Sequence, residues 1–299
     1  MSFSSDVKNE IANIEQTELA ECCQKAEEYG LLLFGRSFAP SSISILTENA
    51  VVAQKYIAAV VRVTGKEPVY LCSKSGKHTV SVRDAQQKKS LLAEFGHDGR
   101  EVGLRINYAN FADDCCRAAF IRGVFLACGT VTSPEKEYHL EFSVPYINLS
   151  RDLVKIFDAF LDLAPKISER GGVQIVYFKD SSMIEDVLTL MGAGGASMEL
   201  MNVKIYKEIR NNVNRKVNFE SANIDRAVRA AYVQIQAIKK IEKRRGLQAL
   251  PGELRELALL RLENPEMSLS ELGRALREPA SRSAVNHRLM KLIRMAEKL

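Results

Sequence analysis

The spacing of apolar residues divides the chain into two parts of different character. Up to about residue 195, β-branched segments of strand length alternate with segments in which apolar residues recur every three or four positions. The predicted strands are 42–47, 69–73, 78–83, 138–144 and 173–179, and the predicted helices between them lie near 49–64 and 150–163. Beyond Gly195 the helical spacing continues alone. These patterns predict an α+β domain over residues 1–195, followed by an all-α domain.

The first part contains an internal repeat. The segment CCQKAEEYGLLLFGRS (22–37) aligns with CCRAAFIRGVFLACGT (115–130), and a similar order of strands and a helix follows each. The identical pairs are Cys22/Cys115, Cys23/Cys116, Ala26/Ala119, Gly30/Gly123 and Leu33/Leu126. We therefore expect two pseudo-repeats, about 20–100 and 113–195. Their first helices should pack face to face, since glycines on the shared face let two backbones approach closely.

The second part has the spacing of amphipathic helices. Its first apolar stripe predicts a helix that ends in a basic run, 239–245, with Gly246 as a left-handed stop. That stripe consists of Ile224, Val228, Ala231, Ile235 and Ile238. The segment 196–220, which contains the polar run 211–216, is interpreted as a linker that permits reorientation of the domain 221–299.

Residues 268–299 show the spacing of a helix-turn-helix motif. Ser268 and Glu271 predict a capping box, in which the serine side chain caps the helix start and the glutamate reaches back to it. After a break at Pro279, Ser281 begins a last helix. Its expected buried line is Val285, Leu289, Leu292 and Ala296. At about 100° per residue, polar and basic side chains flank this line or face away from it. The predicted DNA-binding residues are Ser268, Ser270, Ser281, Arg282, Ser283, Asn286, His287, Arg288, Lys291 and Arg294.

These residue types suit the chemistry of a DNA contact. The first turn of a recognition helix meets base edges in the major groove, where Asn pairs with adenine and Arg with guanine. Serine and lysine side chains hold phosphates. The alternative interpretation is a three-helix bundle used for protein contact, whose charged face is only solvated.

Charge strengthens the division into two parts. The chain has 299 residues, 46% of them hydrophobic and 26% charged, as in ordinary globular proteins. Its net charge of +5 is unevenly distributed. Residues 1–210 carry 24 Lys and Arg against 27 Asp and Glu, a net of −3, whereas residues 211–299 carry 18 against 10, a net of +8. A basic domain joined to another domain is typical of nucleic-acid-binding proteins.

The sequence also bears on location. No stretch approaches the roughly 20 apolar residues of a membrane span. The first ten residues lack the basic-then-apolar order of a signal peptide. We expect a cytoplasmic, nucleoid-associated protein without a membrane partner.

Candidate catalytic and ligand-binding groups are few. The cysteines are Cys22, Cys23, Cys72, Cys115, Cys116 and Cys128. They form no C-x-x-C pair, and adjacent cysteines are poor spacing for tetrahedral zinc, so they are interpreted as small buried hydrophobic residues. The acidic pair Glu27 and Glu28 is interpreted as helix-surface charge. Ser75-Gly76-Lys77 lacks the first glycine of a phosphate-binding loop, because position 71 is leucine. We expect no catalytic, cofactor-binding or metal-binding residues.

The duplicated part resembles the LAGLIDADG homing-endonuclease fold, a pseudo-two-fold αββαββ duplication with one motif helix per half. The motif aligns with Glu28–Arg36 and with Ile121–Gly129. The family's metal-binding acid near the end of each motif helix is replaced here by Gly35 and by Cys128. Phosphodiester cleavage in that family needs a carboxylate there to hold the divalent metal that activates water. The resemblance therefore implies the fold without the catalytic acids.

The combination of this domain with a helix-turn-helix resembles the WhiA family of bacterial transcription regulators. The resemblance rests on Ser2–Glu10, on Arg122–Thr130, on Ser268–Gly273 and on Ser281–Arg288. The last segment is similar to the family's S-K-S-x-V-N-H-R recognition-helix start, with Arg282 in place of lysine. Arginine keeps the charge but changes the geometry of a phosphate or base contact.

The resemblance implies a regulator from a Gram-positive bacterium that binds double-stranded DNA in promoter regions. It also implies a role in cell division, chromosome segregation or sporulation, and no enzymatic activity. The N-terminal domain would then contact the transcription machinery or a regulator protein, or read DNA shape weakly.

The sequence is also compatible with two other functions. One is a metal-dependent endonuclease of LAGLIDADG type with residual activity, which nicking of supercoiled plasmid in the presence of magnesium would reveal. The other is a protein-interaction scaffold whose basic helices never touch DNA. Unchanged DNA affinity after replacement of Asn286 and Arg288 by alanine would favour that second function.

Overall fold

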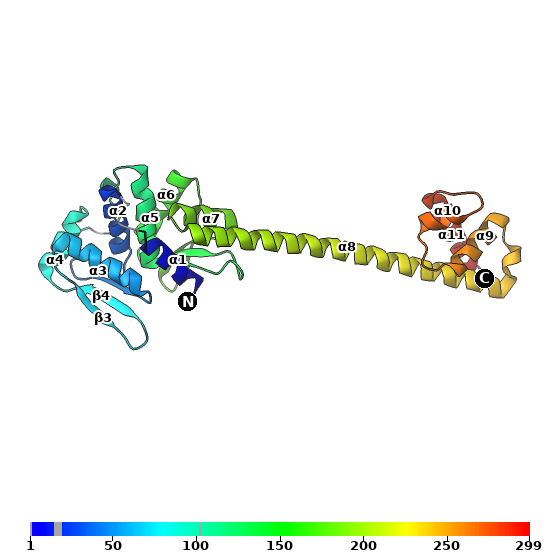
Figure 1. Cartoon of the computed structure of the whole chain (residues 1–299), viewed down its shortest axis with the longest axis horizontal. Helices are drawn as coiled ribbons and strands as arrows, with labels where there is room; N and C mark the ends of the chain where they lie inside the picture. The colour runs from blue at the N-terminus through cyan, green and yellow to red at the C-terminus, as the bar shows by residue number, and fades with distance from the viewer. Residues whose placement is uncertain (1, 15–19, 102) are drawn as a thin grey trace. The chain divides into compact units, whose positions relative to one another are not determined.

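The computed structural model describes residues 2–14, 20–101 and 103–299 (Figure 1). The chain divides into two compact units, Met1–Lys207 and Glu208–Leu299. Among the described residues, no helix has both the length and the apolar character needed to cross a membrane.

The first unit consists of a short helix, α1 (Phe3–Ala12), and two halves with the same order of elements. The first half contains α2 (Glu21–Leu33), β1 (Ser37–Phe38), β2 (Ile43–Thr47), α3 (Ala50–Thr64), β3 (Val69–Cys72), β4 (His78–Val82) and α4 (Ala85–Glu94). The second contains α5 (Asp114–Cys128), β5 (Gly129–Val131), β6 (Leu140–Val144), α6 (Ile147–Leu161), β7 (Lys166–Arg170), β8 (Val173–Phe178) and α7 (Ser181–Leu190). A short 3-10 turn, η2 (Tyr108–Asn110), precedes α5. The duplicated α+β fold is therefore confirmed.

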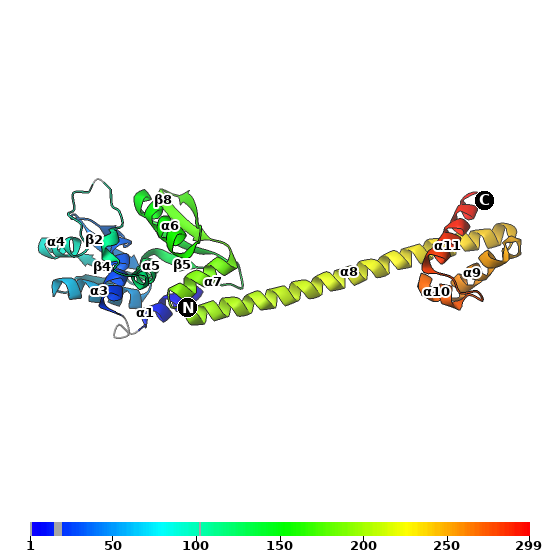
Figure 2. The ribbon, with the colours of Figure 1, turned by 90° about the horizontal axis from the view of Figure 1, so that it is seen from above.

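Each half builds one antiparallel sheet. The strand orders are β1-β2-β4-β3 and β5-β6-β8-β7, so equivalent strands occupy equivalent places. The central pairs also match in register, from Ile43↔Val82 to Thr47↔His78 in one sheet and from Leu140↔Phe178 to Val144↔Gln174 in the other. Helix α3 packs on the first sheet, against β2 and β4, and α6 packs on the second, against β6 and β8. Helices α4 and α7 close the respective halves (Figure 2). The short strands β1 and β5 and the exposed strand β7 are additions to the segments predicted from the sequence.

Helices α2 and α5 pack directly against each other, as expected from the repeated glycines. A Cβ atom added to Gly123 would lie 1.9 Å from the backbone oxygen of Glu27. One added to Gly30 would lie 2.4 Å from the backbone oxygen of Phe120. Since side chains cannot occupy such space, only glycine permits this separation of the two helices. The prediction that the first helices of the repeats meet face to face is confirmed.

The acidic pair of α2 lies inside the unit and not on a helix surface, so its interpretation from the sequence is wrong. Glu27 accepts from Lys55 Nζ at 2.6 Å and from Arg122 Nη1 at 3.2 Å. Glu28 accepts from Arg62 Nε at 2.6 Å. Burial raises the pKa of Glu28, and the hydrogen bond from Arg62 opposes that rise. Buried carboxylates need such partners because an unpaired charge is costly away from water.

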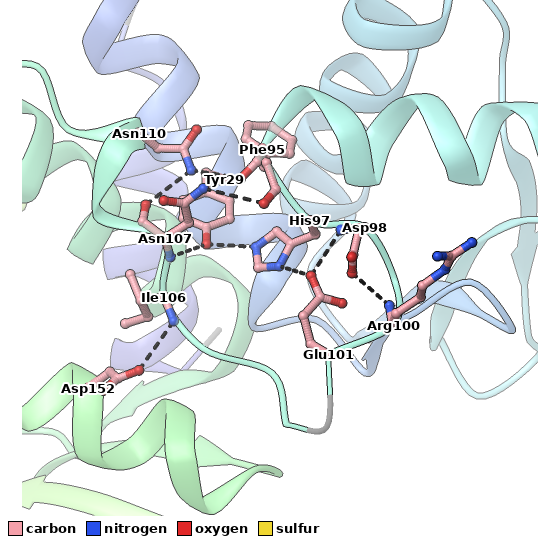
Figure 3. A network of polar contacts seen from close by, with 11 residues as sticks. Tyr29, Phe95, His97, Asp98, Arg100, Glu101, Ile106, Asn107, Asn110 and Asp152 are labelled. Atoms are coloured by element: carbon pink, nitrogen blue, oxygen red, sulfur yellow. Dashed lines mark hydrogen bonds and ion pairs between the residues drawn. The ribbon is translucent and has the colours of Figure 1, made fainter.

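The connection between the two halves is held against α2 by a buried polar network (Figure 3). The backbone N–H of Asn107 donates to Tyr29 Oη at 2.7 Å, and Tyr29 Oη lies 2.9 Å from His97 Nε2. The other ring nitrogen, His97 Nδ1, lies 3.1 Å from Glu101 Oε1. Asn107 Nδ2 donates to the carbonyl of Phe95 at 3.0 Å. These side chains thereby find polar partners inside the unit, and their hydrogen bonds position the connection.

A long helix, α8 (Gly194–Arg245), crosses the boundary between the two units. Residues 196–220, interpreted above as a linker, are helical throughout. The reorientation expected of that segment remains a prediction. Glu10 of α1 accepts from the backbone N–H groups of Gly195 at 2.6 Å and of Ala196 at 3.2 Å, so it caps the start of α8. Gly246 follows with φ 75° and ψ 148°, a positive φ but not the left-handed helical conformation expected of it.

The second unit contains the end of α8, a short 3-10 turn η3 (Leu247–Ala249), and helices α9 (Gly252–Glu263), α10 (Leu269–Ala275) and α11 (Arg282–Glu297). Its apolar core includes the whole buried line expected of the last helix, which comprises Val285, Leu289, Leu292 and Ala296. By contrast, only the end of the predicted α8 stripe joins this core: Ile238 is buried, whereas Ile224 and Val228 are exposed.

Candidate nucleic-acid interface

The start of α10 is fixed by the capping box predicted from the sequence. Ser268 Oγ accepts from the backbone N–H of Glu271 at 3.3 Å, and Glu271 Oε2 accepts from the backbone N–H of Ser268 at 2.8 Å. The hydrogen bonds from Ser268 lower the pKa of Glu271, because they favour its charged form. Ser268 and Ser270 are both exposed at this helix start.

The turn between α10 and α11 depends on a glycine. A Cβ atom added to Gly273 would lie 2.2 Å from the backbone oxygen of Ala280. The same two residues are joined by a hydrogen bond from Ala280 N to Gly273 O, of 2.9 Å. Ser281 then caps α11 by accepting from the backbone N–H of Ala284 at 3.2 Å. The close approach at Gly273 therefore sets where the last helix begins.

Helix α11 separates its residues into two faces. Nine of the ten predicted DNA-binding residues are exposed, two of them at the start of α10 and seven on or just before α11. The seven are Ser281, Arg282, Ser283, Asn286, His287, Lys291 and Arg294. We call them the α11 polar face. It carries three cationic side chains and an amide within about three and a half turns, and it faces away from the apolar core.

The tenth predicted residue, Arg288, is only half-exposed and forms an ion pair. Its Nη2 atom lies 2.8 Å from Glu253 Oε2, in the first turn of α9. The glutamate side chain is 70% exposed, so water screens the ion pair. Its contribution to the stability of the fold is therefore less than about 1 kcal/mol. A DNA phosphate or a guanine edge can therefore compete with Glu253 for this guanidinium.

A buried arginine, which the sequence analysis did not identify, supports the approach to α10. Arg261 Nη1 donates to the carbonyl oxygens of Met267 at 2.7 Å and of Pro265 at 3.3 Å. Burial lowers the pKa of this guanidinium. The two bonds hold the chain between α9 and α10 in the path that leads to Ser268. The only clue in the sequence is an arginine at an inward position of α9. Its partners are backbone carbonyls, which every residue has, so no residue type in the sequence identifies them.

The ends of helices α2 and α5, where endonucleases of this fold carry acids, have different chemistry here. Gly35 lies just after α2 and has no ligand atom to offer, and Cys128 is the last residue of α5. Burial raises the pKa of Cys128 to about 12, so it is a thiol at neutral pH. Lys8 Nζ, which donates to the carbonyl of Leu126 at 3.3 Å, lies close to this thiol. A neutral thiol is poorly suited to hold magnesium, which prefers carboxylate oxygens.

Comparison with known proteins agrees with the two-unit architecture. A family model described as the WhiA LAGLIDADG-like domain matches residues 117–210, and one described as the WhiA C-terminal HTH domain matches residues 213–296. The "Probable cell division protein WhiA" of Ruminiclostridium cellulolyticum is 37% identical over 310 residues, covering 100% of this chain and 98% of the relative. The chain belongs to the WhiA family. A protein of the same name from Alkaliphilus metalliredigens is 35% identical over 314 residues, covering 100% of this chain and 98% of that relative.

Solved structures of WhiA proteins share the fold. Full-length DUF199/WhiA from Thermatoga maritima matches with a TM-score of 0.60 at 24% identity, covering 100% of this chain and 99% of that one. The N-terminal LAGLIDADG domain of DUF199/WhiA matches with a TM-score of 0.50 at 18% identity, covering 64% of this chain and 92% of that one. The family relationship confirms the α+β fold with a degenerate LAGLIDADG-like domain and a C-terminal HTH domain.

Proposed function

We propose that this protein is a sequence-specific DNA-binding transcription regulator that acts in cell division, chromosome segregation or sporulation. In this proposal the α11 polar face reads promoter DNA. The observation that carries it is the exposed, basic surface of the last helix, which follows a short capped helix and a tight turn. The relatives named as probable cell division proteins support the choice of process.

The dimensions and residue types of α11 suit the major groove. An α-helix with its side chains is about 10–12 Å across, and the major groove is about 12 Å wide. Asn286, one turn into the helix, can pair with adenine through its amide. Arg282 and Lys291 lie near the start and the middle of the helix, where they can hold phosphates or guanine.

Charge complements this geometry. Residues 211–299 carry a net charge of +8, and each phosphate contact made by Lys or Arg releases counterions from DNA. Affinity should consequently fall steeply as salt is raised. The N-terminal residues, 1–210, carry a net of −3, which disfavours extensive phosphate binding. We assign to that domain the binding of a partner protein of the transcription machinery.

The test is a fluorescence-anisotropy titration of full-length protein with labelled promoter fragments and with a shuffled duplex of the same composition. Replacing Asn286 by alanine should remove about 1–3 kcal/mol of preference for the promoter. Replacing Arg282 by alanine should weaken both duplexes and reduce the slope of log affinity against log salt, by about 0.9 for each lost phosphate contact.

A matched control is Arg170→Ala, which removes the same charge from an exposed position on β7 in the other unit. Affinity and salt slope should stay at their wild-type values in this variant. Equal binding of promoter and shuffled duplex by the wild type, or no effect of Asn286→Ala and Arg282→Ala, would overturn the proposal.

A further inference from the structure

The N-terminal turns of helices α2 and α5 bring four cysteine side chains together. Cys22 and Cys23 lie in the first turn of α2, and Cys115 and Cys116 lie in the first turn of α5. The four Sγ atoms all lie within 4.8 Å of one another. Spacing along the chain hides this cluster, since neither pair alone resembles a metal-binding motif. The interpretation of the cysteines as small buried hydrophobic residues is wrong for Cys72 and Cys115, which are exposed, and it does not account for the clustering of these four.

The separation of the four sulfur atoms suits a single metal ion of tetrahedral geometry. With Zn–S bonds of about 2.3 Å, the edges of a ZnS4 tetrahedron are about 3.8 Å long. All Sγ–Sγ separations are within 4.8 Å, so the widest pair exceeds this edge length by no more than about 1 Å. Zinc has a filled d shell, so its electrons favour no particular coordination geometry. In structural sites it is commonly bound by four ligands in a tetrahedron, including four cysteine thiolates.

The surroundings favour a site that carries negative charge. Four thiolates around a divalent ion leave a net charge of −2, and both helices present their positive N-terminal ends to it. Cys23 and Cys116 are buried, whereas Cys22 is half-buried and Cys115 is exposed. The cluster is thus enclosed on one side, and an ion can enter from solvent on the other.

The cluster also lies apart from the positions where endonucleases of this fold hold metal. Those positions are at the C-terminal ends of the same helices, where Gly35 and Cys128 stand here. The cysteines lie at the opposite ends of these helices. A metal bound there would therefore be structural, because it would lie away from the position of the endonuclease metal.

We propose that Cys22, Cys23, Cys115 and Cys116 together bind one zinc ion, which ties the N-terminal turns of α2 and α5 to each other. Binding converts four thiols to thiolates and releases four protons to solvent, without any change of oxidation state. The ion links the two pseudo-repeats across residues that are distant in sequence, and it stabilises the helix pair at the centre of the first unit.

The experiment is a cobalt titration of the full-length chain after reduction and removal of metal under anaerobic conditions. Tetrahedral Co(II) bound to thiolates gives intense visible d–d bands and sulfur-to-cobalt charge transfer, and added zinc should abolish both. We expect one equivalent to bind to the wild type. Cys115→Ser changes an exposed side chain and should weaken binding about 100-fold or more, because losing even an outer-shell partner costs about 10–100-fold.

Cys72→Ser is the matched control, since Cys72 is exposed on β3, outside the cluster. It should bind cobalt and zinc as the wild type does. Zinc should raise the melting temperature of the wild type and of Cys72→Ser, but not that of Cys115→Ser, whose metal-free melting temperature should equal that of the metal-free wild type.

Three results would overturn the proposal. One is a reduced wild type that gives no tetrahedral cobalt spectrum, and another is a Cys115→Ser variant that binds metal as the wild type does. The third is a thiol titration in which protein isolated without oxidants shows fewer than its six cysteines after denaturation in chelator, because the cluster would then be held by disulfides.

Discussion

Replacing Gly123 by alanine tests the close packing of α2 and α5. The added Cβ atom would lie 1.9 Å from the backbone oxygen of Glu27 and 2.9 Å from the backbone nitrogen of Leu31. Both neighbours are backbone atoms of a helix, so no side chain can rotate away. The two helices must separate by roughly 1 Å, and that movement loosens the contacts of the buried Tyr29 and Phe120.

The magnitude follows from two opposing terms. Overpacking in a dense core costs about 1–3 kcal/mol, and a backbone clash of this depth belongs at the upper end. Alanine has a higher helix propensity than glycine, which by itself would increase the free energy of unfolding by about 1 kcal/mol. The net loss for Gly123→Ala is therefore about 2 kcal/mol, equivalent to a fall of about 4–8 °C in the melting temperature of a unit this size.

The assay is differential scanning calorimetry of the full-length protein, in which the transition of the first unit should move and that of the second should not. Gly194→Ala is the control, because among the described residues nothing lies within 4 Å of the Cβ atom it would add at the start of α8. It should leave the transition unchanged or raise it slightly. If Gly123→Ala behaved like Gly194→Ala, the argument that glycine sets the helix separation would be refuted.

Three further predictions concern single residues in the two units. Gly273→Ala should unfold the turn before α11 and abolish specific DNA binding, because its Cβ atom would meet the backbone oxygen of Ala280; a wild-type gel shift would contradict this. Glu253→Gln releases Arg288 and removes a negative charge, so it should tighten DNA binding severalfold, within the roughly 1 kcal/mol of an exposed pair, and weaker binding by anisotropy would contradict it. Cys128 should resist alkylation by iodoacetamide at pH 8 in the folded protein, since burial raises the pKa of its thiol to about 12. The rate of alkylation should rise as the pH approaches that value. Alkylation as fast as in the unfolded chain would contradict the burial of this thiol.

The features that could be predicted well are those that depend on residues close together in the sequence or on the internal repeat. Gly30 and Gly123 recur in equivalent places, so the close approach of their helices could be inferred before the structure. The capping box of Ser268 and Glu271 depends on residues three positions apart, and it forms as expected. The buried line of α11 follows from its spacing alone.

The features that the sequence did not predict depend on partners from distant elements. Glu27 is neutralised by Lys55 and by Arg122, residues 28 and 95 positions away, so local pattern assigned it to the surface. The pairing of Arg288 with Glu253 joins two helices whose crossing no spacing rule specifies. The cysteine cluster was missed for the same reason, since each of its pairs was judged by its own neighbours.

Chromatin immunoprecipitation with sequencing in the native host shows whether the α11 polar face reads specific DNA. We expect discrete wild-type peaks near promoters that share a common sequence, and the loss of those peaks in an Asn286→Ala strain with unchanged protein abundance. Peaks that persist in that strain, or a wild type spread evenly over the chromosome, would contradict specific reading by this face.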